Sequence, residues 1–171
     1  MRVTTSVIAL TALVAGCASM MASGPSAVAT LAPTKGNATA GTVSFVQKGD
    51  KVVVTARVSG LAPGAHGFHI HEKGDCASDD AMSAGGHFNP HGKAHGNPTV
   101  PDHHAGDMPM LTADSYGEAN LTAELDVIAV GGGAADVIGR SVIVHKDPDD
   151  FKTQPTGNSG ARVACGVIRK A

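Results

Sequence analysis

A histidine-rich stretch between residues 66 and 107 constrains this chain more than any other feature. Eight of the nine histidines in the 171 residues lie in it. It opens with a strand-like segment in which His69 and His71 face the same side, because side chains alternate along a strand. The rest of the stretch is rich in Gly, Asp, His and Pro and has neither a strand period nor a helix period. An apolar core cannot order such a segment, so we expect bound metal ions to hold it.

The candidate ligands are imidazoles and one carboxylate, a set that suits copper and zinc better than calcium or magnesium. They come from two expected strands and from the loop between them: His69, His71, His87, His95, His104, Asp107 and His145. A single histidine is usually structural. Seven candidate ligands gathered in this way are not explained by that role, so the sequence predicts a metal site.

The remainder of the chain has the pattern of an all-β domain. Short apolar or alternating runs occur at 27–33, 38–47, 51–61, 65–71, 109–113, 118–127, 139–145 and 162–168. Turn-forming residues separate them, such as Lys35-Gly36-Asn37 and Lys48-Gly49-Asp50. Val43 and Phe45 alternate with polar neighbours, and no segment keeps a helical period over a dozen residues. About eight short strands predict an antiparallel sandwich or barrel, with a second polar loop at 146–160.

The net charge of −2 and the isoelectric point near 6.5 give no general attraction for nucleic acid, and no such partner is expected. Any steering of a charged substrate must therefore come from local charges.

The first residues are typical of an export signal. Arg2 precedes an uncharged, largely apolar run, residues 3–15, that is too short to span a bilayer. Val14-Ala15-Gly16-Cys17 resembles a bacterial lipobox, in which Cys17 carries lipid and attaches the protein to a membrane. The alternative is ordinary cleavage within residues 18–23. We expect a signal peptide over residues 1–17, a flexible tether over 18–26 and one domain over 27–171.

The cysteine count agrees with export. If Cys17 is lipidated or removed, Cys76 and Cys165 remain as a pair in an oxidising compartment. A disulfide between them is the favoured interpretation, and two buried thiols are the alternative.

Five motifs, in this order, resemble the copper/zinc superoxide dismutase family. They are Gly67–Glu72, Gly86–Pro90, His104–Asp107, Gly139–His145 and Gly157–Val167. The likeness runs from about Ala27 to the C-terminus and implies an eight-stranded antiparallel Greek-key sandwich or barrel, Ig-like, with a long metal-binding loop and a second, electrostatic loop. Together with the export signal it points to the exported bacterial branch, in the periplasm or cell envelope.

The resemblance also implies roles for individual residues. Copper would be held by His69, His71, His87 and His145, and zinc by His87, His95, His104 and Asp107. His87 would bridge the two ions and take up a proton when copper is reduced. Asp149 would link ligands of both sites, Cys76 and Cys165 would form the family disulfide, and Arg162 would attract a small anion at the mouth of the copper channel. The implied reaction converts superoxide to dioxygen and hydrogen peroxide and protects the envelope from oxidative damage.

Some positions depart from the family or have no role in it. Many relatives have a lysine where this chain has Pro155, so Lys152 or Lys146 are candidates to attract the substrate, although both are also typical of solvated surface charge. His66 is expected to be structural. His91 and His103 are expected to be exposed surface residues, with weak extra metal binding as the alternative. Two alternative functions are a non-catalytic copper or zinc binder and an Ig-like adhesive domain. The resemblance leaves open whether the protein is a homodimer or a monomer.

Overall fold

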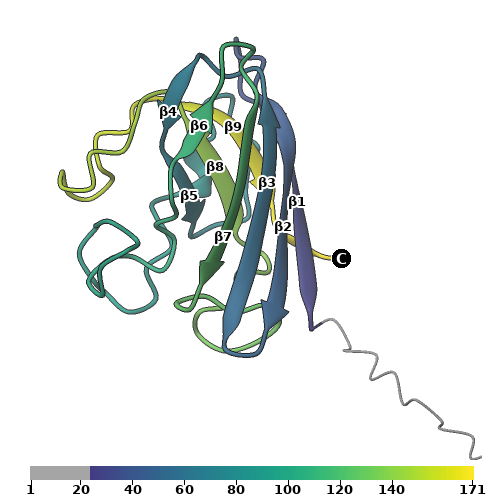
Figure 1. Cartoon of the computed structure of the whole chain (residues 1–171), viewed down its shortest axis with the longest axis vertical. Coiled ribbons are helices and arrows are strands. Elements are labelled where there is room, and N and C mark those ends of the chain that lie inside the picture. The colour runs from purple at the N-terminus through teal and green to yellow at the C-terminus, as the bar shows by residue number, and fades with distance from the viewer. Residues whose placement is uncertain (1–23) are drawn as a thin grey trace, which may run out of the picture.

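The computed structural model describes residues 24–171 (Figure 1). The predicted signal peptide and Cys17 lie outside these residues, as does most of the predicted tether. The described chain is built of strands and loops, with one short 3-10 helix, η1 (Met82–Ala84). The strands are β1 (Ser26–Pro33), β2 (Ala40–Lys48), β3 (Lys51–Ser59), β4 (Gly64–His66), β5 (Phe68–His71), β6 (Leu111–Ala113), β7 (Ala119–Leu125), β8 (Ser141–His145), β9 (Arg162–Val167) and β10 (Arg169–Lys170). Within this part of the chain, no helix is long and apolar enough to span a bilayer.

Eight of the described strands form one antiparallel sheet that curls on itself. Its order is β5-β8-β9-β1-β2-β3-β7, with β10 also paired to β1, and β4 pairs separately with β6. In Figure 1, β1, β2, β3 and β7 form one wall, and β5, β8 and β9 lie behind it. The chain crosses from β3 to the far edge of the sheet at β5, as Greek-key connections do. The predicted all-β, antiparallel Greek-key architecture is confirmed.

The apolar core lies between the two walls. Val43 and Phe45 on β2 and Val52 and Val54 on β3 are fully buried, as the alternating pattern predicts. The hairpin between these strands closes at the Lys48–Lys51 pair. Gly49 in its two-residue loop has a φ of 62°, the left-handed backbone that such a loop needs.

Strand β5 connects this core to the histidine-rich loop. Phe68 and Ile70 have no exposed surface, and burial of each such side chain stabilises the fold by about 1.5–3 kcal/mol. His69 and His71 lie on the other face of the same strand and are also fully buried, because the long loop covers them. Core packing therefore fixes the backbone from which two candidate ligands project.

The prediction of a single strand ending at His71 is wrong in one respect. Residues 64–66 pair with β6, whereas residues 68–71 pair with β8, so the chain changes partners at Gly67. A Cβ atom at this glycine would lie 2.7 Å from the side chain of Ser159, closer than packed atoms tolerate. The close approach brings the second loop, 146–160, against the start of β5.

Both long loops lie on the same side of the sheet. Figure 1 shows the histidine-rich loop in teal and the second loop in olive and yellow, both extending from the side that carries β4 and β5. Phe88 N donates to Ile70 O at 2.8 Å, and Gly106 N donates to Phe88 O at 2.8 Å. These bonds attach the middle of the first loop to β5. The fold thus gathers the predicted ligands at one place.

Candidate metal centre

Four buried imidazoles converge at the end of β5 and form what we call the four-histidine cluster: His69, His71, His87 and His145. Their candidate ligand atoms lie within 4.8 Å of one another. One nitrogen of each ring is buried and has no hydrogen-bond partner, namely Nδ1 of His69 and Nε2 of the other three. An unpaired buried polar atom costs about 1–3 kcal/mol. Four of them gathered together fit a metal ion that would accept their lone pairs.

The second ring nitrogen is hydrogen-bonded in all four histidines, to the Asp107 carboxylate in His87 and to groups outside both candidate ligand sets in the other three. His69 Nε2 donates to Asp149 Oδ2 at 2.6 Å, His71 Nδ1 to Gly85 O at 2.9 Å, and His145 Nδ1 to Gly160 O at 3.2 Å. Each of these bonds places the ring proton on the nitrogen that faces the protein. The other nitrogen then keeps the lone pair that a metal needs.

A second group of four, which we call the Asp107 cluster, consists of His87, His95, His104 and Asp107. Asp107 Oδ1 lies 2.8 Å from His87 Nδ1, 3.0 Å from His95 Nδ1 and 3.5 Å from His104 Nδ1. Tetrahedral zinc with bonds of about 2.0–2.1 Å separates its ligand atoms by about 3.3 Å. The observed spacings surround that value, so the cluster fits zinc.

His87 belongs to both clusters. Its Nδ1 faces Asp107, while its Nε2 is the unpartnered atom of the four-histidine cluster. An isolated β-bridge to His71 holds its backbone beside β5.

Burial keeps three rings of the four-histidine cluster in their metal-binding protonation state. Burial, and then the neighbouring His69, lower the pKa of His145 to about 3. Burial lowers the pKa of His87 to about 4, although its hydrogen bond to Asp107 acts in the opposite direction. The pKa of His71 is held well below its ordinary value, mainly by the same cause. These rings are neutral at pH 7, as metal ligands must be.

Asp149, from the second loop, joins the two clusters. Its Oδ2 accepts from His69, and its Oδ1 accepts from His95 Nε2 at 2.9 Å and from Phe151 N at 2.7 Å. Burial alone would raise the pKa of Asp149, but the hydrogen bonds from His69 and His95 lower it below its usual range. The carboxylate therefore stays ionised and orients one ring of each cluster.

The structure contains the disulfide between Cys76 and Cys165, whose Cα atoms are 5.8 Å apart. It attaches the segment around η1 to β9. Arg162, on the same strand, donates from Nη1 to Ala81 O and from Nη2 to Gly85 O, each at 2.7 Å. The disulfide and these bonds together hold the half-buried guanidinium in place.

A cavity of about 710 Å³ opens beside the four-histidine cluster, with His145 and Arg162 in its wall. Lys35, Asp79 and Asp80 also line it. Lys35 Nζ lies 2.8 Å from Asp79 Oδ2, in an exposed ion pair. No sequence signal marks Lys35, because it lies in the turn after β1, far along the chain from every predicted ligand.

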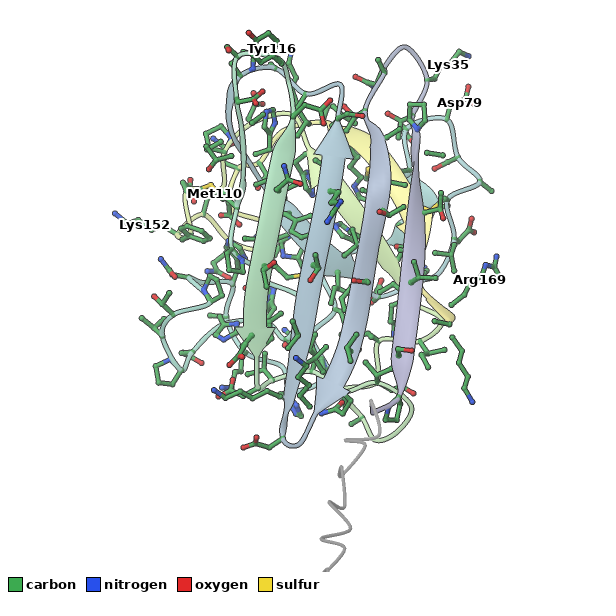
Figure 2. The ribbon with its side chains drawn as sticks, turned by 45° about the vertical axis from the view of Figure 1, so that its right-hand side comes forward. Lys35, Asp79, Met110, Tyr116, Lys152 and Arg169 are labelled. Carbon is green, nitrogen blue, oxygen red and sulfur yellow. A yellow bond between two sulfur atoms is a disulfide. The ribbon has the colours of Figure 1, made fainter. Side chains whose placement is uncertain are left out.

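The two lysines considered from the sequence lie elsewhere. Lys146 and Lys152 are exposed, and neither belongs to the wall of this cavity. Figure 2 shows Lys152 on the opposite side of the molecule from Lys35 and Asp79. Lys35 is therefore the lysine that the fold brings to the mouth of the cavity.

The remaining histidines have structural or surface positions. His66 is buried, with Nδ1 2.9 Å from His145 O and Nε2 2.8 Å from Ala62 O. His91 is exposed, as expected. The same expectation was wrong for His103, which is buried because the loop folds over it and whose Nδ1 lies 2.7 Å from His104 O.

Comparison with known proteins gives one family. The profile of the copper/zinc superoxide dismutase family (SODC) matches residues 39–168. A crystal structure of the clock protein EA4 is similar, with 37% sequence identity and a TM-score of 0.78, covering 85% of this chain and 94% of that one. The match spans the whole sheet apart from β1 and β10, both loops, and every residue of the two clusters. This chain therefore belongs to the copper/zinc superoxide dismutase family.

Proposed function

We propose that the protein disproportionates superoxide to dioxygen and hydrogen peroxide, with copper in the four-histidine cluster and zinc in the Asp107 cluster. The observation that carries this proposal is the set of four buried, unpartnered ring nitrogens beside an open cavity. An all-imidazole set suits a redox-active copper, and a His₃Asp set suits zinc. Bound copper would supply the one-electron redox chemistry, whereas zinc has none.

The residues of the chain would prepare this chemistry in three ways. The core under β5 fixes His69 and His71, and Asp149 orients His69 from behind. His87 would bridge the two ions, and its Nε2 is the atom that would hold a proton between the two halves of the cycle. Arg162 offers a positive charge beside His145 in the cavity wall, where a small anion would arrive.

Family membership alone does not establish catalysis, since a relative of this fold is described as a clock protein. The features that favour an enzyme over a copper or zinc store are the shared His87 and the position of Arg162. A store needs neither a ligand common to both clusters nor a cationic side chain in the wall of an open cavity.

The proposal includes the place where the protein works. We infer export to a bacterial periplasm or cell envelope, with lipid on Cys17 as a membrane anchor. The disulfide between Cys76 and Cys165 supports an oxidising compartment, and the N-terminal sequence supports export.

The test is to load the purified protein with copper and zinc and to measure superoxide consumption beside the EPR spectrum of the copper. We expect fast turnover and a multi-imidazole copper(II) signal, both lost in His145→Ala. Arg162→Ala should keep the signal and lower kcat/KM. Tight copper binding without turnover would refute the proposal of an enzyme and would favour the alternative of a non-catalytic copper or zinc binder.

A further inference from the structure

His95 depends on other parts of the chain more than the strand-borne ligands do. His69 and His71 lie on β5 and His145 lies on β8, so sheet hydrogen bonds fix their backbones. His95 lies in irregular chain, in the loop between β5 and β6. Its backbone N–H and C=O therefore need partners from outside a sheet, because buried peptide groups are nearly always hydrogen-bonded.

One side chain of the second loop supplies both partners. His95 N donates to Gln154 Oε1 at 2.8 Å, and Gln154 Nε2 donates to His95 O at 2.8 Å. A carboxamide carries the same donor and acceptor as a peptide group. Gln154 thus bonds to His95 as the opposite residue of a hydrogen-bonded antiparallel pair would.

Gln154 is presented by a turn that is bonded internally. The Asp150 carboxylate accepts from Lys152 N at 2.9 Å and from Thr153 N at 2.8 Å. Asp150 N donates to Gly157 O at 2.9 Å, and Gly157 N donates to Thr153 O at 2.7 Å. The turn therefore holds its shape without help from His95 and presents the carboxamide to it.

The ring of His95 is held as closely as its backbone. Nε2 donates to Asp149 Oδ1 at 2.9 Å, and Nδ1 lies 3.0 Å from Asp107 Oδ1. Asp149 belongs to the same loop as Gln154. The second loop consequently fixes the backbone of His95 through one residue and the ring through another.

We propose that Gln154 is a positioning residue for the zinc ligand His95, and that zinc affinity depends on this pairing between the two loops. The inference rests on the proposed function, which assigns zinc to the Asp107 cluster. Without Gln154, His95 loses its two backbone partners and its ring is aimed by side-chain bonds alone. Removal of a group that orients a metal ligand typically costs 10–100-fold in metal affinity.

The experiment compares the zinc affinity of the unchanged protein with that of Gln154→Ala and Gln154→Glu, by competition with a chelator for Zn²⁺. Both variants should bind zinc about 10–100-fold more weakly. Glutamate keeps the size of the side chain but places a carboxylate oxygen opposite His95 O, where it cannot donate a hydrogen bond. A loss of zinc affinity in Gln154→Glu would therefore come from the hydrogen bond and not from packing. Gln154 is exposed, so neither change disturbs the core. Copper affinity of the four-histidine cluster should stay near that of the unchanged protein.

Lys152→Ala is the matched control, because that side chain lies in the same turn, is exposed and has no bond to His95. Its zinc affinity should equal that of the unchanged protein. A second readout is hydrogen exchange of the His95 amide in the zinc-free protein, which should be slow in the parent and in Lys152→Ala and faster in Gln154→Ala.

Unchanged zinc affinity in both Gln154 variants would overturn the inference while leaving the proposed function intact. An unchanged protein that binds no zinc in this cluster would instead overturn the proposed function and the inference with it.

Discussion

Removal of the disulfide is expected to destabilise the fold and to loosen Arg162 at the same time. The perturbation is the double variant Cys76→Ala and Cys165→Ala. Cys165 lies in a small buried cluster with Ala81, Ala84 and Ile143, so alanine places no unpaired hydroxyl there. The two cysteines are 89 residues apart in the chain. A cross-link that closes a loop of about 90 residues restricts the unfolded chain by about 4.6 kcal/mol at 25 °C in the chain-entropy model.

The assay is urea unfolding of the metal-free protein and of the double variant under the same conditions. We expect the free energy of unfolding to fall by about 2–4.6 kcal/mol, and the slope m to rise because the unfolded chain becomes less compact. Ile143→Val is the control for packing in the same cluster, with an expected loss of about 0.5–1.5 kcal/mol and an unchanged m. A loss below about 1 kcal/mol in the double variant, the size of an ordinary point mutation, would refute the reasoning.

The same variant tests how Arg162 is held. Its guanidinium bonds to Ala81 O and Gly85 O, which belong to the segment that the disulfide attaches to β9. In the copper- and zinc-loaded protein, kcat/KM should therefore fall, but by less than in Arg162→Ala. An unchanged kcat/KM would show that the two carbonyl bonds suffice to place the side chain.

Three further predictions concern the charges around the centre. In Asp149→Asn, the amide NH₂ must face the ring N–H of either His69 or His95, and His95 should move because it lies in a loop. Zinc affinity, measured by chelator competition, should therefore fall about 10–100-fold. An unchanged affinity would contradict this. Lys35→Ala should lower kcat/KM at low ionic strength, with the difference vanishing at high salt, whereas Lys152→Ala, also exposed, should have no effect at either. Burial lowers the pKa of His95, but hydrogen bonds to the Asp107 and Asp149 carboxylates outweigh burial and raise this pKa to about 9. Zinc uptake by the metal-free protein at pH 7 should therefore release a proton, and this release should disappear well above pH 9. Calorimetry in two buffers of different ionisation enthalpy measures the number of protons released.

Local patterns were enough to predict the strands and the chemistry of the ligands. The alternation around Val43, Phe45, Val52 and Val54 follows directly from the two-residue period of a strand, and these residues form the core. The pair His69 and His71 shares one face for the same reason. Such features depend on neighbours in the chain, which the sequence displays.

Features that depend on distant parts of the chain were not predictable in this way. The change of partners at Gly67 depends on the positions of β6 and β8, and the burial of His103 depends on the folding of its loop. Lys35 reaches the cavity because β1 pairs with β9, which places the turn after β1 near Arg162. Gln154 had no recognisable motif, since its role consists only of two bonds to the backbone of a residue in another loop.

The two clusters differ in what holds them, and the difference has consequences for metal loss. Three of the four histidines of the first cluster lie on β5 and β8, so the core of the domain fixes them before any metal arrives. The Asp107 cluster is carried by a loop, and His95 in particular is fixed by side chains of the second loop, Asp149 and Gln154. Local opening of loops requires far less free energy than opening of core strands. Zinc should therefore leave more readily than copper, and its loss should leave the sheet and the ligands that lie on β5 and β8 in place.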